Sequence, residues 1–317
     1  MSAAAETAPP APTLHVPASA PPAKRRVWPW IALGIVWVVW GSTYLAIRVL
    51  VHEAPPLLAA SLRFFCAGLI MAGVALVVDR RHGRPSRQQW LDYSLVGVLL
   101  LAIGNGLVMW SERTVPSGTA ALIVATVPVW ILVLDGLRPH GEPWTMRVWL
   151  GTVIGLAGVA LVARPQVAVS SGHWLAMGAL QVACLAWTLG SLYAQAVPRK
   201  LPLATAAAIE MVAGSIALAL LSRLFAEDPS RLAAMSTRAW SAFGYLVAFG
   251  SLVGFTAFAY CLNELPATTV GTYAYVNPVV AVFLGWLILG ESLTPGLLAG
   301  GALIVLSVVL TTLRKRG

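Results

Sequence analysis

Residues 265–280 read LPATTVGTYAYVNPVV, and residues 115–130 read VPSGTAALIVATVPVW. Both stretches are apolar, and each contains two prolines in the same register. The second proline of each pair, Pro128 and Pro278, stands 150 positions from its counterpart. The two stretches therefore predict an internal repeat, and their lack of charge raises the question of which environment surrounds them.

Composition indicates a membrane. Hydrophobic residues make up 58% of the 317 residues and charged residues 10%, whereas a soluble domain carries about 25% charged residues. A spanning helix needs roughly 20 mostly apolar residues. The sequence predicts an all-α polytopic membrane protein with ten transmembrane helices. The predicted spans are 28–50, 57–78, 90–111, 116–136, 144–163, 172–196, 203–225, 239–262, 267–289 and 295–313.

The basic residues predict the orientation. If both termini are cytoplasmic, 14 of the 21 Lys and Arg residues face the cytoplasm and six face outward, with Arg63 inside a span. Positively charged short loops stay on the cytoplasmic side, so we expect both termini inside and the lipid bilayer as the surroundings. The net charge of +9 then gives no reason to expect a nucleic-acid partner. Residues 1–27 are expected to form a disordered cytoplasmic tail, and residues 314–317 a basic one.

The repeat extends beyond the opening stretches. WGSTY at 40–44 has a partner in GSLY at 190–193, and SLRFFCAG at 61–68 has one in AIEMVAG at 208–214. These echoes predict two units of five helices.

The units cover residues 28–165 and 172–313. Because five is odd, the second unit enters the membrane from the opposite side, and the repeats are inverted. Inverted repeats are typical of transporters, whose substrate site lies near the midplane between the repeats. Two inverted copies of one unit give outward-open and inward-open states of similar energy, which a transporter needs.

Several motifs resemble the EamA family of the drug/metabolite transporter superfamily, and most closely its YedA-like bacterial inner-membrane exporters. They are WGSTYLAIR (40–48), LRFFCAG (62–68), GNG (104–106), VPSG (115–118), VATVP (124–128), GLAG (155–158), AIEM (208–211) and YAYVNPVVA (273–281). The resemblance covers roughly residues 28–313. It implies ten helices around a central cavity and export towards the periplasm, but it does not identify a substrate.

Two ionisable residues lie well inside predicted spans, at equivalent positions of the repeats: Arg63 and Glu210. Charges in hydrocarbon are costly and usually face a cavity or a partner. Arg63 falls in the outer half and Glu210 in the inner half, so a direct salt bridge is not expected. Arg63 either lines the cavity or snorkels to the outer interface. Glu210 either binds substrate or protons, as a coupling group, or forms an interhelical hydrogen bond.

Mid-span aromatic and amide side chains supply the other candidates for lining the cavity, because their polar atoms need partners in the membrane. Many of the Trp and Tyr residues belong instead to interfacial belts. The mid-span candidates are Trp40, Tyr44, Asn105, Trp187, Tyr193, Tyr273, Tyr275 and Asn277.

Prolines and glycines predict helix shape and packing. Pro128 and Pro278 fall in mid-span, where proline kinks a helix; these kinks serve either as flexing points or simply as packing shape. GTVIG at 151–155 and GLLAG at 296–300 place small residues four apart, which permits close helix contact. We expect this contact within the monomer, with a homodimer seam as the alternative.

These features favour a secondary active exporter of small organic molecules, such as drugs, metabolites or amino-acid-like compounds, working by alternating access and with proton coupling as an option. A facilitative carrier or channel-like permease is the alternative. An enzyme is not expected, since the sequence has no HExxH, GxSxG or P-loop motif. The five histidines lie outside or at the margins of the spans, so neither a metal nor a cofactor is expected.

Overall fold

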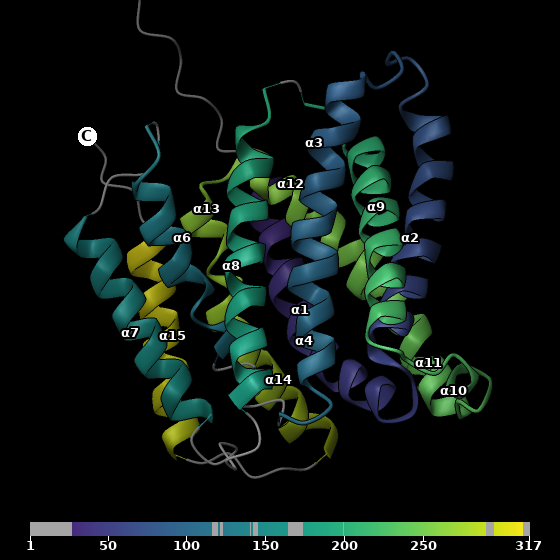
Figure 1. The fold of residues 1–317 in the computed structure, drawn as a ribbon. Helices are drawn as coiled ribbons and strands as arrows, with labels where there is room; N and C mark the ends of the chain where they lie inside the picture. Colours follow the sequence, from purple (N-terminus) through teal and green to yellow (C-terminus); the bar gives the residue numbers. More distant parts are fainter. Residues whose placement is uncertain are drawn as a thin grey trace, which may run out of the picture.

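The computed structural model describes residues 27–115, 120, 123–139, 141, 145–163, 174–198, 200–289 and 295–312, and this part of the chain is helical and contains no strand (Figure 1). The predicted basic tail and all but one residue of the predicted N-terminal tail lie outside it. The helices are α1 (Trp28–Glu53), α2 (Pro56–Val78), α3 (Arg87–Gly97), η1 (Val98–Asn105), α4 (Gly106–Ser111), α6 (Val127–Gly136), α7 (Met146–Ala163), α8 (Trp174–Ala196), α9 (Leu203–Leu224), α10 (Ser230–Ala233), α11 (Thr237–Tyr245), η4 (Leu246–Phe255), α12 (Thr256–Glu264), α13 (Ala267–Val270), α14 (Tyr273–Leu289) and α15 (Pro295–Thr312).

Among the residues that the structure describes, six helices are long and apolar enough to cross a membrane. Two of them are composite: α3, η1 and α4 run on as one helix, as do α11, η4 and α12. Other apolar helices in the described residues are shorter, including α6, α7 and α15. The six long helices are Trp28–Glu53, Pro56–Val78, Arg87–Ser111, Trp174–Ala196, Leu203–Leu224 and Thr237–Glu264.

Local signals set the helix ends. Helix α1 stops at Ala54, whose backbone is extended, because the residue before a proline is disfavoured in helical conformation. Pro55 and Pro56 then begin α2, where a missing amide hydrogen costs nothing. Helix α3 begins at a capping box, in which Ser86 and Gln89 each accept a hydrogen bond from the other's backbone amide.

The helices pack in corresponding pairs. Helix α2 packs along α9, and α7 packs along α15. Helix α1 contacts α14 and the composite helix α11–η4–α12, while α8 contacts α6 and the composite helix α3–η1–α4. The contacts of α1 with α14 and with the composite helix α11–η4–α12 thus correspond to those of α8 with α6 and with the composite helix α3–η1–α4. Figure 1 shows the arrangement of these helices.

A reciprocal pair of carboxylates joins α2 and α9. Glu227, which follows α9, accepts hydrogen bonds from the backbone amides of Leu57 (3.1 Å) and Leu58 (2.9 Å) at the start of α2. Asp79, which follows α2, accepts hydrogen bonds from the backbone amide (3.0 Å) and hydroxyl (2.8 Å) of Thr205 at the start of α9. Each helix thus ends in the residue that satisfies free amides at the start of the other.

The two composite helices contain π-helical segments, η1 and η4, which widen the helix and are frequent at functional sites. Each segment lies close to a tryptophan of the opposite half. A Cβ atom at Gly104 would lie 2.9 Å from the Trp187 ring, and one at Gly254 would lie 2.5 Å from Trp40 Nε1. The glycines therefore permit two indoles to approach the backbone.

The two mid-span prolines, Pro128 and Pro278, lie in different local structures. Pro128 lies in the first turn of α6, directly after a turn at 125–126, so the chain is interrupted just before the proline rather than kinked at it. Proline is tolerated there because first-turn amides have no helical partner. Pro278 lies inside α14, which itself begins after a turn at 271–272.

Close helix contact at the glycines of α7 occurs within the chain. A Cβ atom at Gly151 would lie 2.8 Å from the Thr311 side chain, and one at Gly158 would lie 2.8 Å from the Gly300 carbonyl oxygen, both on α15. These glycines therefore let α7 and α15 approach closely.

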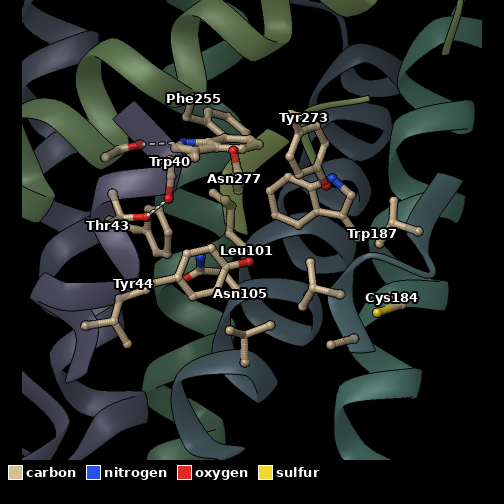
Figure 2. A pocket seen from close by; sticks show the side chains of 18 of the residues that line it. Trp40, Thr43, Tyr44, Leu101, Asn105, Cys184, Trp187, Phe255, Tyr273 and Asn277 are labelled. Carbon is tan, nitrogen blue, oxygen red and sulfur yellow. Dashed lines mark hydrogen bonds between the residues drawn. The ribbon is translucent and has the colours of Figure 1, made fainter. Parts of the chain in front are cut away.

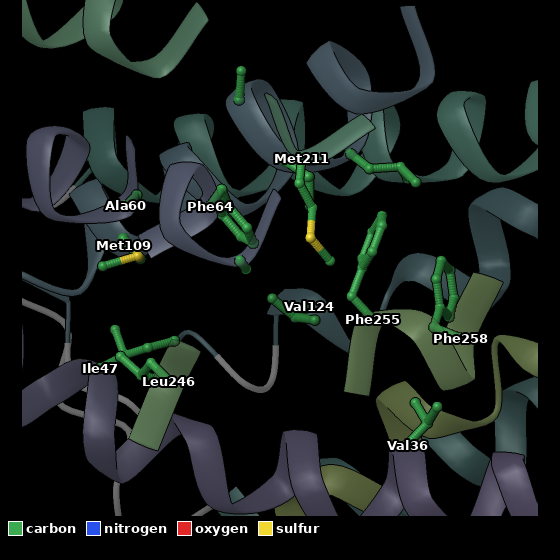
Figure 3. Packing of buried hydrophobic residues seen from close by; sticks show 14 of the residues in the cluster. Val36, Ile47, Ala60, Phe64, Met109, Val124, Met211, Leu246, Phe255 and Phe258 are labelled. Carbon is green, nitrogen blue, oxygen red and sulfur yellow. The ribbon is translucent and has the colours of Figure 1, made fainter. Parts of the chain in front are cut away.

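The main hydrophobic core lies between the long helices (Figure 3). It brings together Phe64 of α2, Met211 of α9, Phe255 of η4 and Phe258 of α12, all at most 2% exposed. The core thus unites both halves of the chain and forms one wall of the cavity described next.

Candidate functional site

A cavity of about 700 Å³ lies between α1, α2, the two composite helices, α8 and α14 (Figure 2). Apolar residues such as Ile47, Leu101 and Val127 form much of the wall. The polar and aromatic lining residues are Trp40, Thr43, Tyr44, Arg63, Phe64, Asn105, Cys184, Trp187, Phe255, Tyr273 and Asn277.

The cavity lies toward one end of the bundle. We name the two ends by the helix α1, the Trp28 end where it begins and the Glu53 end where it finishes. The lining residues of α1 run from Trp40, at its middle, to Ile47, and Arg63 comes from the first half of α2, which starts at the Glu53 end. The cavity therefore occupies the half of the bundle nearer the Glu53 end.

Five rings form an aromatic layer at the inner limit of this cavity: Trp40, Trp187, Phe255, Phe258 and Tyr273. The Trp40 ring centroid is 5.4 Å from that of Trp187, 5.0 Å from that of Phe258 and 5.0 Å from that of Tyr273. Phe255 lies 6.3 Å from Phe258. Such pairs each contribute about 0.5–1.5 kcal/mol beyond the burial of their area.

Hydrogen bonds fix part of the layer. Trp40 donates from Nε1 to the Gly250 carbonyl (3.2 Å) and accepts at its own carbonyl from the Thr43 hydroxyl (2.8 Å). The side-chain amide of Asn277 is oriented with its nitrogen facing two backbone carbonyls, because this orientation satisfies both ends of the amide. It then donates to the carbonyls of Trp37 (3.2 Å) and Tyr273 (3.0 Å). The layer is thus tied to α1, η4 and α14.

Three polar atoms at the cavity have no hydrogen-bond partner among the described residues. They are Asn105 Oδ1 and Trp187 Nε1, in addition to Nη1 of Arg63, which is described below. In Figure 2, Asn105 and Tyr44 lie together on one side of the cavity, and Trp187 and Tyr273 lie on the other. Since buried polar groups are normally satisfied, these atoms are available to a ligand.

Arg63 lies in the cavity wall and is 3% exposed. Its Nε donates to the Ser251 hydroxyl at 2.8 Å, and its Cζ lies 4.7 Å from the centroid of the Phe64 ring. This geometry directs the guanidinium across to η4, so the side chain does not snorkel to the bundle end.

Glu210 lies in a second, smaller cavity of about 370 Å³. That cavity is lined by Tyr93 of α3, Leu203 of α9 and Asn263 of α12, so it occupies the half of the bundle nearer the Trp28 end. Phe255 lines both cavities, and Phe258 lines the second, so the aromatic layer lies between the two.

The surroundings of Glu210 are tightly packed. The residue is 3% exposed, and its Oε2 has no hydrogen-bond partner among the described residues. A Cβ atom at Gly97 would lie 2.1 Å from the Glu210 carbonyl oxygen, so α3 and α9 touch backbone to backbone. In the loop before α9, burial lowers the pKa of the Lys200 ammonium, and the negative charge of nearby Glu210 opposes this shift.

Seven of the ten candidates predicted from the sequence line the main cavity: Trp40, Tyr44, Arg63, Asn105, Trp187, Tyr273 and Asn277. The other three lie elsewhere. Besides Glu210, Tyr193 is 37% exposed and its hydroxyl donates to Asp92 Oδ1 at 2.8 Å. Tyr275 is fully buried with Ala125, Val159 and Ile304, away from both cavities.

Sequence reasoning missed the contribution of the composite helix α11–η4–α12. Gly250, Ser251 and Phe255 surround Arg63 and the aromatic layer, and their only sequence signal is the glycine-rich FGSLVGF run. It also missed Glu112, which directly follows the long helix Arg87–Ser111 and is 2% exposed. Burial raises the pKa of the Glu112 carboxyl to about 8, although Arg48 opposes the shift.

No group of His, Cys, Asp and Glu suited to a metal ion occurs among the described residues. The three cysteines Cys66, Cys184 and Cys261 carry free thiols.

The chain resembles known transporters along most of its length. The pattern of the EamA-like transporter family matches it twice, over residues 28–164 and 174–313. It is 38% identical to the uncharacterized inner membrane transporter YedA of Escherichia coli K12, with 90% of each chain covered. It is 27% identical to a probable terminal-alkyne amino-acid exporter of Streptantibioticus cattleyicolor, with 92% of this chain and 95% of that one covered. A chain of known crystal structure has the same fold, with a TM-score of 0.74 at 19% identity, covering 90% of this chain and 97% of the other.

Proposed function

Because the chain belongs to the EamA-like transporter family, we propose that it is a secondary active exporter of small organic molecules that works by alternating access. The substrate occupies the main cavity, and the aromatic layer closes the path toward the Trp28 end. The observation that carries this proposal is the pair of cavities on opposite sides of the aromatic layer. A carrier needs a site that is accessible from one side at a time, and a movable layer between two cavities supplies it.

The proposal includes two inverted five-helix repeats over residues 28–165 and 172–313. The corresponding helix contacts and the reciprocal carboxylates Asp79 and Glu227 support it. A rotation about an axis in the membrane plane that exchanges α2 and α9 also exchanges the two cavities. The inward-open state then repeats the outward-open state with the halves exchanged.

The Trp28 end faces the cytoplasm in this proposal, so the main cavity faces the periplasm of the inner membrane. The distribution of Lys and Arg supports this orientation. Export as the direction of transport is supported by the exporter among the similar proteins.

Glu210 is the proton-coupling group in the same proposal. It is a buried carboxylate with an oxygen that has no partner among the described residues, and it lies in the cavity nearer the cytoplasm. A proton on Glu210 would neutralise its charge and thereby ease the closure of that cavity around it.

Transport by purified protein in proteoliposomes tests the proposal. Substrates would first be sought by comparing a deletion strain with an overexpressing strain for resistance to toxic amino-acid analogues and drugs, with intracellular accumulation measured. A carrier shows saturable uptake and counterflow of such a compound. Uptake that rises linearly with concentration and shows no counterflow would indicate a channel-like permease and contradict the proposal.

A further inference from the structure

Arg63 is a buried cation with an unused hydrogen-bonding edge. Its Nε is occupied by Ser251 and its face lies near Phe64, but its Nη1 has no hydrogen-bond partner among the described residues. In the same part of the chain no carboxylate lies within ion-pair distance of it. A guanidinium that is 3% exposed and lacks a counter-charge is unusual, because buried charges are normally paired.

The chemistry of the free edge indicates its ligand. Guanidinium groups present a planar set of N–H donors that matches the two oxygens of a carboxylate. Among the described residues that line the main cavity, Arg63 is the sole charged one. A single positive charge balances the single negative charge of a carboxylate, whereas a phosphate ester would carry excess charge in an otherwise neutral cavity.

We propose that Arg63 binds the carboxylate of an organic anion whose apolar body lies against the aromatic layer. This rests on the proposed function, since it identifies the class of substrate for the same cavity. The rings of Trp40, Trp187 and Tyr273 offer the apolar body a surface of adjoining faces and edges. The partnerless Trp187 Nε1 offers it a hydrogen-bond donor.

Two residues of η4 position the guanidinium. The Ser251 hydroxyl holds Nε, and the absence of a side chain at Gly250 leaves room for Nη2, since a Cβ atom there would lie 2.8 Å from it. Substituting either residue would displace the guanidinium while keeping its charge. The pair therefore gives variants that alter the proposed site without removing the cation.

Three probes that share one ring test the proposal: indole-3-acetate, which is an anion, indole-3-acetamide, its neutral isostere, and tryptamine, a cation. Binding of each radiolabelled probe to the full-length protein in lipid nanodiscs would be measured. The wild type is expected to bind indole-3-acetate at least about 10-fold more tightly than the other two, as the loss of one charged hydrogen-bonded pair implies.

The variants assign that preference to Arg63. Arg63→Gln should weaken indole-3-acetate binding by about 10-fold or more and leave indole-3-acetamide nearly unchanged, and Arg63→Lys should fall between the two because it loses the planar fork. Arg223→Gln removes an exposed arginine from the last turn of α9 and is the matched control, expected to bind as the wild type does. Should Arg63→Gln fail to fold, Ser251→Ala and Gly250→Ala are expected to reduce the preference for the anion severalfold.

The proposal is overturned if the wild type does not bind indole-3-acetate, or binds the amide or amine as tightly. It is also overturned if Arg63→Gln, or both η4 variants, retain the full preference for the anion. Counterflow of the same probes in proteoliposomes separates this outcome from a failure of the proposed function. Saturable counterflow of tryptamine alone would support the proposed transport and contradict the anion site. Arg63-dependent binding without any transport would support the anion site and contradict the proposed transport.

Discussion

Arg63 and Glu210 are each the eighth residue of their helices, α2 and α9, and both are 3% exposed, yet their surroundings differ. Arg63 borders a cavity of about 700 Å³, and its Nε donates to the hydroxyl of Ser251 on η4. Glu210 borders about 370 Å³ of space, and its own backbone is in contact with Gly97. One charge faces an open volume, and the other sits in a tight helix contact.

This difference teaches that a charge inside a span does not by itself identify the role of a residue. The free volume next to the charge decides whether a ligand the size of an organic molecule or only a proton can reach it. This difference supports the proposal that Arg63 binds the organic ligand and Glu210 the proton, and variants of either residue test it.

The largest effect is expected for Glu210→Gln, which keeps the shape and hydrogen bonding of the side chain but removes its titration. It should abolish efflux driven by an imposed pH gradient while leaving counterflow and indole-3-acetate binding close to wild type. Proteoliposome transport, normalised to reconstituted protein, measures this. Wild-type transport that ignores the gradient would end the assignment of the proton to Glu210.

A substantial effect on stability is expected for Gly97→Ala. The new methyl group would collide with the Glu210 backbone, which cannot move aside easily, so a loss of about 1–3 kcal/mol or more is expected from overpacking. Thermal unfolding in detergent measures this loss.

Two glycines provide matched controls for that substitution. Gly250→Ala meets the flexible end of Arg63, and Gly34→Ala meets nothing within 4 Å, so both should cost less than Gly97→Ala. An equal loss in all three variants would show that the two charged sites do not differ in packing.

A smaller, pH-dependent effect is expected for Glu112→Gln. The pKa of Glu112 is raised from 4.5 to about 8 by burial, so the folded state favours the protonated form. The stabilising contribution is therefore fully present below pH 4.5 and is lost as the pH rises through about 8. Glu112→Gln should remove this dependence, as shown by unfolding midpoints at pH 5 and pH 8. If it also abolished pH-driven efflux, the proton would belong to Glu112 rather than to Glu210.

The smallest effect is expected for Ser61→Ala, which removes the 2.8 Å hydrogen bond from the Ser61 hydroxyl to the Ser215 carbonyl. This bond joins the two helices that carry the charges, and its loss should cost about 0.5–1.5 kcal/mol without changing the probe preference. A change in that preference would mean that the cavity depends on the fit of α2 against α9.

Much of this fold could be predicted from the sequence because hydrocarbon imposes a simple rule on composition: long apolar runs form helices. The family could be predicted as well, because motifs such as WGSTYLAIR and YAYVNPVVA resemble those of the EamA family, and the family match confirms it. Aromatic residues such as Trp40 and Trp187 were placed at the cavity from their mid-span positions. The position of a residue along a span determines its depth in the membrane, which explains why these predictions agree with the structure.

The direction in which each side chain points could not be predicted from the sequence. Tyr275 lies two residues from Tyr273 and faces the opposite side of α14, toward α7 and α15. The turn before Pro128 and the π-helical segments depend on tertiary packing, and no short motif encodes them. Glu112 lies beyond the end of a span, where a carboxylate is expected in water, and only the folded chain shows its burial.

The reciprocal carboxylates Asp79 and Glu227 suggest that the two halves of the chain can assemble when they are made as separate polypeptides. Each half lacks an acceptor for the amides that begin its own long helix and carries the acceptor for the other half. Two separate polypeptides ending and beginning between residues 163 and 174 should thus find each other in the bilayer. A single half, made alone, would leave the amides at the start of its α2 or α9 without the carboxylate that accepts from them in the whole chain.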